Sequence, residues 1–271
     1  MPRNFRRDIS KPLPELVSLR EKRALITGSA SGIGEAIAHR FAEAGSDLEL
    51  VDIDEEKLKI VKEDLSEFTI DVAIHKVDLS RKTEIDLLWS KLDGKELNIL
   101  VNNAGTYPFR NFLNTDRDFL EKVIEINLNS VFWMCQHMIK RRLDKGGAII
   151  NIGSIEAILP FKDDLVPYSI SKAGVIALTR ALAKEYGKHN FRINAIIPGG
   201  IMTEGVKNKA KEIFKFKVGL IKSGIEFKQR LPLDRFGQPD EVARMVLVLA
   251  CDLSSYVHGA LIAVDGGFLS A

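Results

Sequence analysis

Short apolar runs alternate with amphipathic helical patterns along most of the chain, and this alternation limits the possible folds more than any other feature. Runs such as 24–27, 48–51 and 148–152 have the length and composition of buried strands. Between the first two, apolar residues recur at helical spacing from Ile33 to Ala44. Strands that alternate with helices form βα units and a parallel sheet. We therefore predict an α/β fold.

Seven strands are predicted in this way, with helices between them. The strands are expected at residues 24–27, 48–51, 70–77, 99–101, 148–152, 193–197 and 261–264. The helices are expected at 33–44, 55–65, about 116–142, 167–186 and 239–249. This order predicts one doubly wound parallel sheet, whose ligand site lies beyond the carboxyl ends of its strands.

Composition and charge argue against several classes of protein. The chain has 39 Lys and Arg against 37 Asp and Glu, a net charge of +2 that gives no support to nucleic-acid binding. No apolar run approaches the ~18 residues needed to span a bilayer, so we expect no membrane partner. Cys135 and Cys251 form no disulfide or zinc pattern and suit a reducing cytoplasm. The histidines have no metal-ligand spacing, so no metal site is predicted.

Two segments stand apart from the strand–helix alternation. Residues 1–22 contain three prolines and lack the apolar stretch of a secretory signal. We interpret them as a partly ordered arm before a single domain at 23–271. Residues 203–230 carry eight basic and three acidic residues and are interpreted as a helical substrate lid. Such a lid either favours an anionic substrate or is a solvated amphipathic segment.

A glycine-rich turn joins the first predicted strand to the first predicted helix. Its glycines follow the spacing GxxxGxG. Glycines let the backbone approach a pyrophosphate, and the N-terminus of the next helix favours the negative charge. Because strand, turn and helix occur in the required order, we predict a dinucleotide site. It includes Gly28, Ser31, Gly32, Ile33 and Gly34.

Asp52 ends the second predicted strand, 18 residues after Gly34. A carboxylate at this point accepts hydrogen bonds from an adenosine ribose and repels a 2′-phosphate. The neighbouring Ser31 and Ile53 are uncharged and offer no cation to such a phosphate. The sequence therefore predicts NAD over NADP as the cofactor.

Tyr168 and Lys172 lie four residues apart in a predicted helix and so share one of its faces. A free tyrosine has a pKa of ~10, and a nearby cation favours the phenolate and lowers that value. Such a pair is common on solvated helices, so other residues must support it. Ser154 follows the predicted strand 148–152, and Asn127 is a polar amide inside an apolar helical pattern.

Clusters of polar residues or glycines follow five of the predicted strands, those at 24–27, 48–51, 99–101, 148–152 and 193–197. Their position at one edge of the sheet predicts a binding crevice there. In this order and spacing the motifs resemble those of the short-chain dehydrogenase/reductase family. They are TGSASGIG (27–34), NNAG (102–105), Asn127, Ser154, YSISK (168–172), PGGIMT (198–203) and VDGG (264–267). The resemblance implies a Rossmann-type fold with seven parallel strands and reversible NAD(P)-linked oxidation of an alcohol to a carbonyl.

The resemblance also implies roles for single residues. Tyr168 would be the general acid/base, and Lys172 would lower its pKa and hold the nicotinamide ribose. Ser154 would hydrogen-bond the substrate oxygen, and Asn127 would position a water that links Lys172 to solvent. Further cofactor contacts are implied for Asp52, Ile53, Asp78, Leu79, Asn103, Ala104, Gly105, Pro198, Gly199, Ile201 and Thr203.

One residue departs from the family pattern. Glu156 follows Ser154 by two residues, where small or apolar side chains are frequent in the family. A carboxylate there either contacts a hydroxyl of a polyol or sugar, or faces water. We expect it to face water.

Three hypotheses for the function follow. The first is an NAD-dependent dehydrogenase of a secondary alcohol or ketone, such as a polyol or sugar. The second is a 3-oxoacyl thioester reductase for an acyl carrier protein or coenzyme A ester, suggested by the basic lid. The third, a non-catalytic dinucleotide-binding protein, has little need of the four catalytic candidates. The resemblance also implies a homotetramer formed through the long helices at 116–142 and 166–187.

Overall fold

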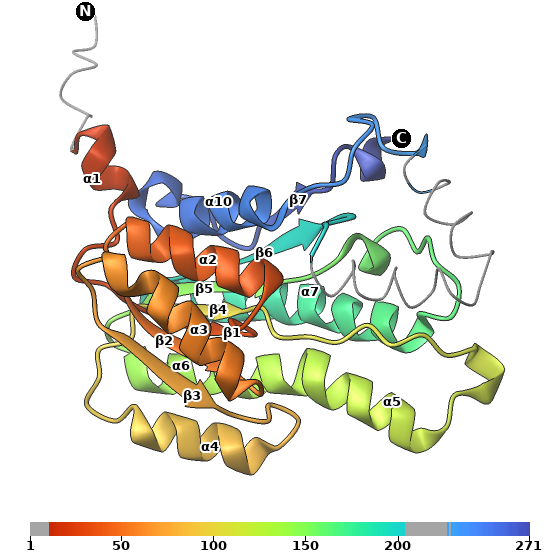
Figure 1. Cartoon of the computed structure of the whole chain (residues 1–271), viewed down its shortest axis with the longest axis horizontal. Coiled ribbons are helices and arrows are strands. Elements are labelled where there is room, and N and C mark those ends of the chain that lie inside the picture. Colours follow the sequence, from red (N-terminus) through yellow and green to blue (C-terminus); the bar gives the residue numbers. More distant parts are fainter. Residues whose placement is uncertain (1–10, 204–226, 228) are drawn as a thin grey trace, which may run out of the picture.

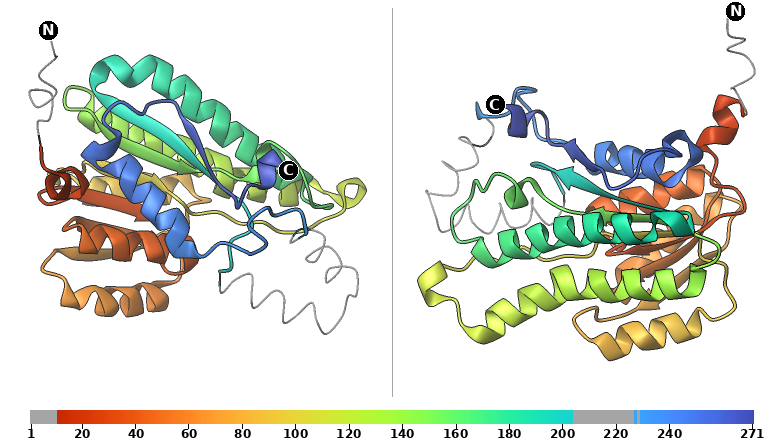
Figure 2. Two further views of the ribbon diagram at one scale, coloured as in Figure 1. Left: turned by 90° about the horizontal axis from the view of Figure 1, so that it is seen from above. Right: turned by 180° about the vertical axis from the view of Figure 1, so that it is seen from behind.

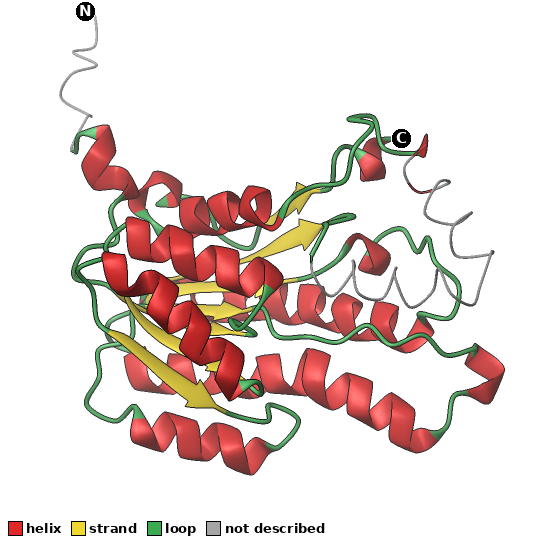
Figure 3. Ribbon diagram, viewed as in Figure 1, coloured by secondary structure: helices red, strands yellow, loops and turns green. Residues whose placement is uncertain are grey.

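The computed structural model describes residues 11–203, 227 and 229–271. Seven parallel strands form one sheet in the order β3-β2-β1-β4-β5-β6-β7, and their arrows run the same way in Figure 3. The strands are β1 (Arg23–Thr27), β2 (Asp47–Asp52), β3 (Val72–Lys76), β4 (Ile99–Asn102), β5 (Gly147–Ile152), β6 (Phe191–Pro198) and β7 (Leu261–Val264). The predicted doubly wound, Rossmann-type α/β fold is confirmed. Chain order reverses between β1 and β4, which opens a crevice at their carboxyl ends.

Helices cover both faces of the sheet (Figures 1 and 2). One face carries α2 (Gly32–Glu43), α3 (Glu55–Asp64) and α10 (Pro239–Ala250). The other carries α4 (Lys82–Lys91), α6 (Ser130–Arg142) and α7 (Val166–Tyr186). The sequence interpretation named no helix at α4. Strand and helix boundaries otherwise agree with the prediction to within a few residues.

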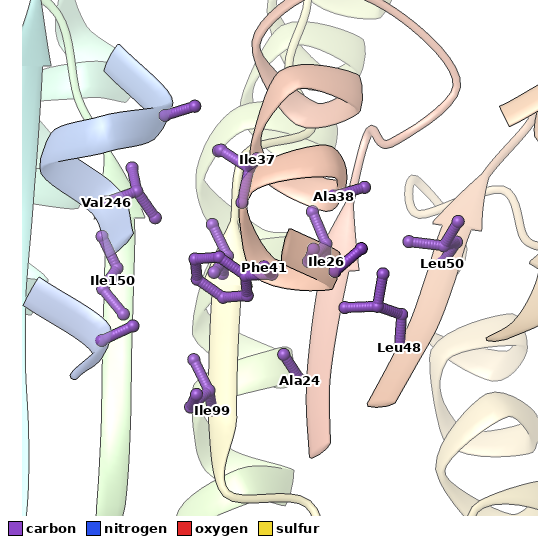
Figure 4. Close-up of a cluster of buried hydrophobic side chains, with 14 of the residues drawn as sticks. Ala24, Ile26, Ile37, Ala38, Phe41, Leu48, Leu50, Ile99, Ile150 and Val246 are labelled. Carbon is purple, nitrogen blue, oxygen red and sulfur yellow. The ribbon is translucent and has the colours of Figure 1, made fainter. Parts of the chain in front are cut away.

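The core on the α2 face shows why the sequence folds in this way. Phe41 and Ile37 of α2 project toward Ile26 of β1 and Ile150 of β5, beside Val246 of α10 (Figure 4). All five side chains are fully buried. Burying each is worth about 1.5–3 kcal/mol. The helical spacing of apolar residues in α2 therefore fixes this helix over the crevice-forming strands.

The long helix predicted at about 116–142 is present, but a π-helical turn that the sequence did not indicate interrupts its regular geometry. The structure has α5 (Arg117–Ile124), a π-helical turn at Glu125–Asn129 and then α6. Asn127 lies in this turn, and its side chain hydrogen-bonds the backbone of Thr106 twice, at 2.8 Å each. The wider turn lets the buried Asn127 amide reach the segment after a neighbouring strand. A regular helix would point this amide in another direction.

The first described residues join the domain. A short helix, α1 (Leu13–Val17), lies beside the end of the sheet, and Lys11 pairs with Asp252 at 2.5 Å. Leu19 is 1% exposed and packs in the α2-side core, although the sequence interpretation placed it in the arm. Most of the predicted lid (204–226 and 228) lies outside the described residues. Within the described ranges, no helix is both long and apolar enough to span a bilayer.

A buried carboxylate ties together the amino-terminal half of the sheet. Glu49 of β2 is fully buried, and it accepts hydrogen bonds from Arg23 (2.9 Å), Lys95 (2.5 Å) and, at 2.7 Å, pairs with His75. Burial acts to raise the pKa of Glu49, but the bonds from His75 and Lys95 outweigh it and lower the value to about 2.

Candidate active site

The glycine turn between β1 and α2 is tightly packed. Gly28 and Gly32 have φ angles of +65° and +62°, which side chains other than glycine rarely adopt. A Cβ on Gly34 would collide with the carbonyl oxygen of Gly28. Asn103, at the end of β4, donates its side-chain amide to the carbonyls of Thr27 (3.0 Å) and Gly28 (2.9 Å). The turn is therefore held against the next strand by a side chain that the sequence interpretation assigned to the cofactor.

Asp52 ends β2 beside this turn. One carboxylate oxygen accepts the Ala30 N–H and the other accepts the Asp54 N–H, both at 3.1 Å. The Ile53 side chain is exposed. Lys76 lies opposite Asp52 in the β2–β3 ladder, so its side chain leaves the sheet on the same face. The sequence interpretation missed this cation, which strand pairing would have indicated.

Asp78 follows β3 at the same edge of the sheet. It accepts hydrogen bonds from the Ser80 hydroxyl (2.6 Å) and the Ser80 N–H (3.0 Å). The hydroxyl bond lowers the pKa of Asp78 despite partial burial. Leu79 is buried. Asp78 thus orders the turn into α4 and stays ionised beside the crevice.

The residues after β6 lie next to the glycine turn. Gly199 donates its N–H to Val264 (3.0 Å), and a Cβ there would lie 2.7 Å from the Cα of Asp265. Ile201 is buried, and its backbone pairs with Gly237. A Cβ on Gly32 would lie 3.2 Å from the Thr203 methyl group. The predicted cofactor residues Pro198, Gly199, Ile201 and Thr203 are therefore brought to the same edge as the glycine turn.

Asn127 connects this edge to α7. Besides its two bonds to Thr106, its amide donates to the Ser171 hydroxyl at 3.2 Å, and Ser171 donates to the Tyr168 carbonyl at 2.6 Å. A Cβ on Gly105 would lie 3.2 Å from Asn127 Oδ1 and 3.5 Å from Lys172 Nζ. Both polar atoms therefore border the space above Gly105, which a side chain at this position would narrow. The sequence interpretation did not single out Ser171.

Ser154, Tyr168 and Lys172 come together where β5 ends and α7 begins. The Ser154 side chain hydrogen-bonds the Tyr168 hydroxyl. Lys172 is 4% exposed, and its Nζ donates to the Ile152 carbonyl at 2.8 Å. The same nitrogen lies 6.0 Å from the Tyr168 ring centroid.

The two ionisable groups have unusual proton affinities. Burial raises the pKa of Tyr168 to about 12, against the opposing effect of the Ser154 hydrogen bond and with the support of the nearby Glu156 charge. Burial also lowers the pKa of Lys172 to about 8. The sequence interpretation expected the lysine to lower the tyrosine value. The opposite direction arises because desolvation disfavours the charged form of both groups.

Glu156 does not face water, so that expectation is wrong. Its side chain is buried, with 7% of its residue surface exposed. It accepts the backbone N–H groups of Phe161 (3.1 Å) and Lys162 (3.3 Å). The chain after Ser154 folds back on itself, and these otherwise unpaired N–H groups draw the carboxylate inward.

Tyr107 is a further residue that the sequence interpretation missed. It follows β4, and its ring meets the Tyr168 ring edge-to-face at 6.3 Å between centroids. Phe109 packs in the same way on Tyr107 at 6.4 Å. These rings form an apolar wall beside the Tyr168 hydroxyl. Among the described side chains, no three His, Cys, Asp or Glu residues are placed to hold a metal ion.

Comparison with known proteins identifies the family. A family model described as enoyl-(acyl carrier protein) reductase matches residues 28–269. The 3-oxoacyl-(acyl-carrier-protein) reductase of Aquifex aeolicus is 34% identical over 260 residues, which cover 93% of this chain and 98% of that one. The chain belongs to the short-chain dehydrogenase/reductase family. It is therefore an oxidoreductase that acts on CH–OH or keto groups, and its family binds NAD(P).

Other members of the short-chain dehydrogenase/reductase family that resemble this chain differ in substrate. The NAD-dependent glycerol dehydrogenase of Listeria innocua is 31% identical over 255 residues, which cover 93% of this chain and 95% of that one. A solved structure from Beutenbergia cavernae is described as an NAD(P)-dependent gluconate 5-dehydrogenase with bound NADP at low occupancy. It matches with a TM-score of 0.86 at 28% identity and covers 94% of this chain and 100% of that one.

The donor set at the crevice fits a dinucleotide. Among the described residues, the Ser31 side chain caps no N–H group of α2, and although the Glu35 carboxylate accepts the Gly32 N–H at 3.1 Å, the N–H groups of Ile33 and Gly34 remain as donors for a pyrophosphate. The Asp52 carboxylate suits ribose hydroxyls. Lys172, at the far end of the crevice, has further N–H donors besides the one given to Ile152.

Proposed function

We propose that the protein transfers a hydride between NAD(H) and a secondary alcohol or ketone of the polyol or sugar type. The observation that carries this proposal is the meeting of Ser154, Tyr168 and Lys172 at the end of β5, on the same edge as the glycine turn. When bound, the nicotinamide supplies or accepts the hydride. The protein supplies position, electrostatics and a proton.

Tyr168 is the proposed general acid/base. Its hydroxyl would hold or accept the proton at the substrate oxygen, and Ser154 would donate a hydrogen bond to the same oxygen as charge develops there. A pKa of about 12 keeps the Tyr168 hydroxyl protonated at neutral pH. The protonated acid is the form that carbonyl reduction requires.

Lys172 and Asn127 are proposed to return a proton to Tyr168 after Tyr168 has donated its own to the substrate. The Lys172 ammonium, 6.0 Å from the Tyr168 ring centroid, borders the space above Gly105, and Asn127 Oδ1 borders the same space. A water held there would join the buried ammonium to solvent. Asn127 would also keep this space open, because its side chain fixes the Thr106 backbone.

NAD is the proposed cofactor, on the grounds that the Asp52 carboxylate would repel a 2′-phosphate. Lys76 is the feature that favours NADP instead, because it leaves the sheet on the same face as Asp52. The ratio of kcat/KM with NADH and NADPH measures this choice. We expect Asp52→Ala to shift that ratio toward NADPH, and Lys76→Ala to shift it toward NADH.

A 3-oxoacyl thioester reductase is the second candidate, supported by the 34% identity to a curated enzyme of that name. Such an activity would use acetoacetyl-coenzyme A as a convenient substrate. The predicted basic lid that first suggested it lies mostly outside the described residues. A kcat/KM for acetoacetyl-coenzyme A that equals or exceeds the kcat/KM for alcohols would favour the thioester reductase over a polyol dehydrogenase.

The test is turnover of NAD(H) and NADP(H) over matched alcohols, polyols, sugar acids and 3-oxoacyl thioesters, with Tyr168→Phe beside the wild type. Loss of a positioned acid/base costs about 10²- to 10⁴-fold in kcat. Tyr256→Phe is the matched control, because Tyr256 is fully exposed. A Tyr168→Phe enzyme as active as the control would refute the proposed mechanism.

We also propose a homotetramer built through α5, α6 and α7. Exposed apolar side chains on these helices support it: Leu120, Phe132, Val166 and Ile170. Sedimentation equilibrium measures the mass directly, and a monomer at micromolar concentration would contradict this assembly.

A further inference from the structure

The segment between β5 and α7 is anchored beside the reactive tyrosine. The Glu156 carboxylate takes both of its short hydrogen bonds from backbone N–H groups of this segment, those of Phe161 and Lys162. Ser154 Oγ accepts the Glu156 N–H at 3.2 Å. The backbone at Lys162 is thus tied, through one buried carboxylate, to the residue that meets the Tyr168 hydroxyl.

This anchoring leaves Lys162 as a half-buried cation beside the ring of Phe109. Its Nζ lies 5.8 Å from the centroid of Phe109, which packs on Tyr107, which in turn packs on Tyr168. Burial lowers the pKa of Lys162, partly opposed by the Glu156 charge. The ammonium has therefore lost part of its hydration, and it lies at the Phe109 end of the series of rings that leads through Tyr107 to Tyr168.

Among the described residues, no carboxylate oxygen lies within ion-pair distance of this ammonium, although the Glu156 charge is near enough to act on its pKa. Glu156 lies closest in sequence among buried acids, but its oxygens accept backbone N–H groups. Asp163 and Asp164 follow Lys162 directly, yet neither forms an ion pair with it in the described part of the chain. A partly desolvated cation that forms no ion pair gains more from an anionic ligand than a solvated surface lysine does.

We propose that Lys162 is a specificity-determining residue that binds the carboxylate of a hydroxy- or keto-acid substrate. This inference rests on the proposed function, because it places the reacting carbon of that acid at Tyr168. A neutral polyol leaves the ammonium unpaired, so the site discriminates against it. The substrate class is then a sugar acid or similar compact hydroxy-acid.

A phosphate is the other anion that an ammonium could bind. In a 3-oxoacyl thioester the phosphates lie at the far end of the pantetheine arm from the keto group. Lys162, in contrast, is joined to Ser154 through Glu156, whose carboxylate accepts the Lys162 N–H at 3.3 Å and whose own N–H is donated to Ser154 Oγ at 3.2 Å. This short connection to the reactive residues favours a carboxylate on a compact substrate.

The experiment compares pairs of substrates that differ in one charge. D-gluconate and glucitol differ only in having a carboxylate or a hydroxymethyl group at one end, and 3-hydroxybutyrate and butane-1,3-diol form a second pair. Initial rates with NAD and with NADP give kcat and KM for wild type, Lys162→Met, Lys162→Arg and the control Lys184→Met. Lys184 is an exposed lysine of α7. Acetoacetyl-coenzyme A and its N-acetylcysteamine analogue complete the panel.

We expect Lys162→Met to raise KM for the acids about 10- to 100-fold, the range for a lost hydrogen bond to a charged group. We expect kcat to change less than about twofold, the neutral partners to be unaffected, and Lys162→Arg to keep most of the acid preference. The stabilisation of the wild type by gluconate in thermal unfolding should also disappear in Lys162→Met.

Other outcomes separate the two proposals. If the wild type is active and Lys162→Met changes KM equally for acids and neutral partners, or does not change it, the role of Lys162 is overturned. The proposed function then still stands. A raised KM for acetoacetyl-coenzyme A but not for its truncated analogue identifies a phosphate and overturns the carboxylate. No turnover of any alcohol, polyol or acid with either cofactor overturns the proposed function itself.

Discussion

Replacing Lys172 by methionine should make the protein more stable while inactivating it. Burial lowers the pKa of Lys172 from 10.5 to about 8. At 1.36 kcal/mol for each tenfold change in proton affinity, holding the charged form in the folded protein at pH 7 costs about 3 kcal/mol. Lys172→Met removes this cost, but it also loses the hydrogen bond to the Ile152 carbonyl, which lowers stability by about 1–2 kcal/mol. Lys172→Met should therefore unfold with a free energy about 1–2 kcal/mol higher than wild type.

The pH dependence tests the cause of this gain. Between pH 8 and pH 10.5 the unfolded chain keeps the Lys172 proton and the folded protein releases it, so wild-type stability rises with pH. By pH 9.5 the cost of burial should fall by about 2 kcal/mol. The advantage of Lys172→Met should shrink to about zero over the same interval.

Urea unfolding at pH 7.0 and pH 9.5, followed by tryptophan fluorescence at fixed protein concentration, measures both differences. Lys184→Met is the control on the same helix, and its difference from wild type should not change with pH. The reasoning is refuted if Lys172→Met is less stable than wild type at pH 7.0. It is equally refuted if the difference stays constant between the two pH values.

Three further predictions concern the framework of the site. Glu49→Gln should lower the free energy of unfolding by about 3 kcal/mol above pH 4.5. Wild type loses this contribution as the pH falls from 4.5 to about 2, so the acid-unfolding curves of the two proteins should converge at low pH. Gly34→Ala should cost about 3 kcal/mol or more in urea unfolding, because its Cβ collides with the Gly28 carbonyl; unchanged stability would contradict the turn geometry. Asn127→Ala should lower stability by about 2–4 kcal/mol, since it leaves the Thr106 N–H and carbonyl without partners, and a melting temperature equal to wild type would argue against those bonds.

The strands were predictable because buried parallel strands are short apolar runs whose signal is local. The glycine turn, Asp52 and Ser154 were predictable for a related reason. Each lies at the end of such a run, and parallel strands bring their carboxyl ends to one edge. Tyr168 and Lys172 lie in α7 instead, and their spacing of four residues predicted only that they share one face of that helix. The positions of the strand-end residues thus followed from strand order, even though the contacts between them did not.

What the sequence did not predict depends on how the chain folds back on itself. The burial of Glu156 requires the segment after it to present the N–H groups of Phe161 and Lys162, and no periodicity announces such a return. The raised pKa of Tyr168 depends on desolvation by all its neighbours, whereas the spacing of Tyr168 and Lys172 reports only one of them. Lys76 was missed because its nearness to Asp52 arises from strand register alone.

The π-helical turn at Glu125–Asn129 determines which way the side chains of α5 face relative to those of α6, since the two helices are otherwise continuous. Each residue of a regular α-helix advances the azimuth by about 100°, so the wider turn rotates α5 relative to α6 by about that angle. This offset lets α5 contact α7 while α6 keeps its apolar stripe on the sheet. Chain length through the turn is therefore constrained as well as the identity of Asn127. Deleting one of the other four residues of the turn should restore the regular helical phase, turn α5 away from α7 and move Asn127 off the Thr106 backbone.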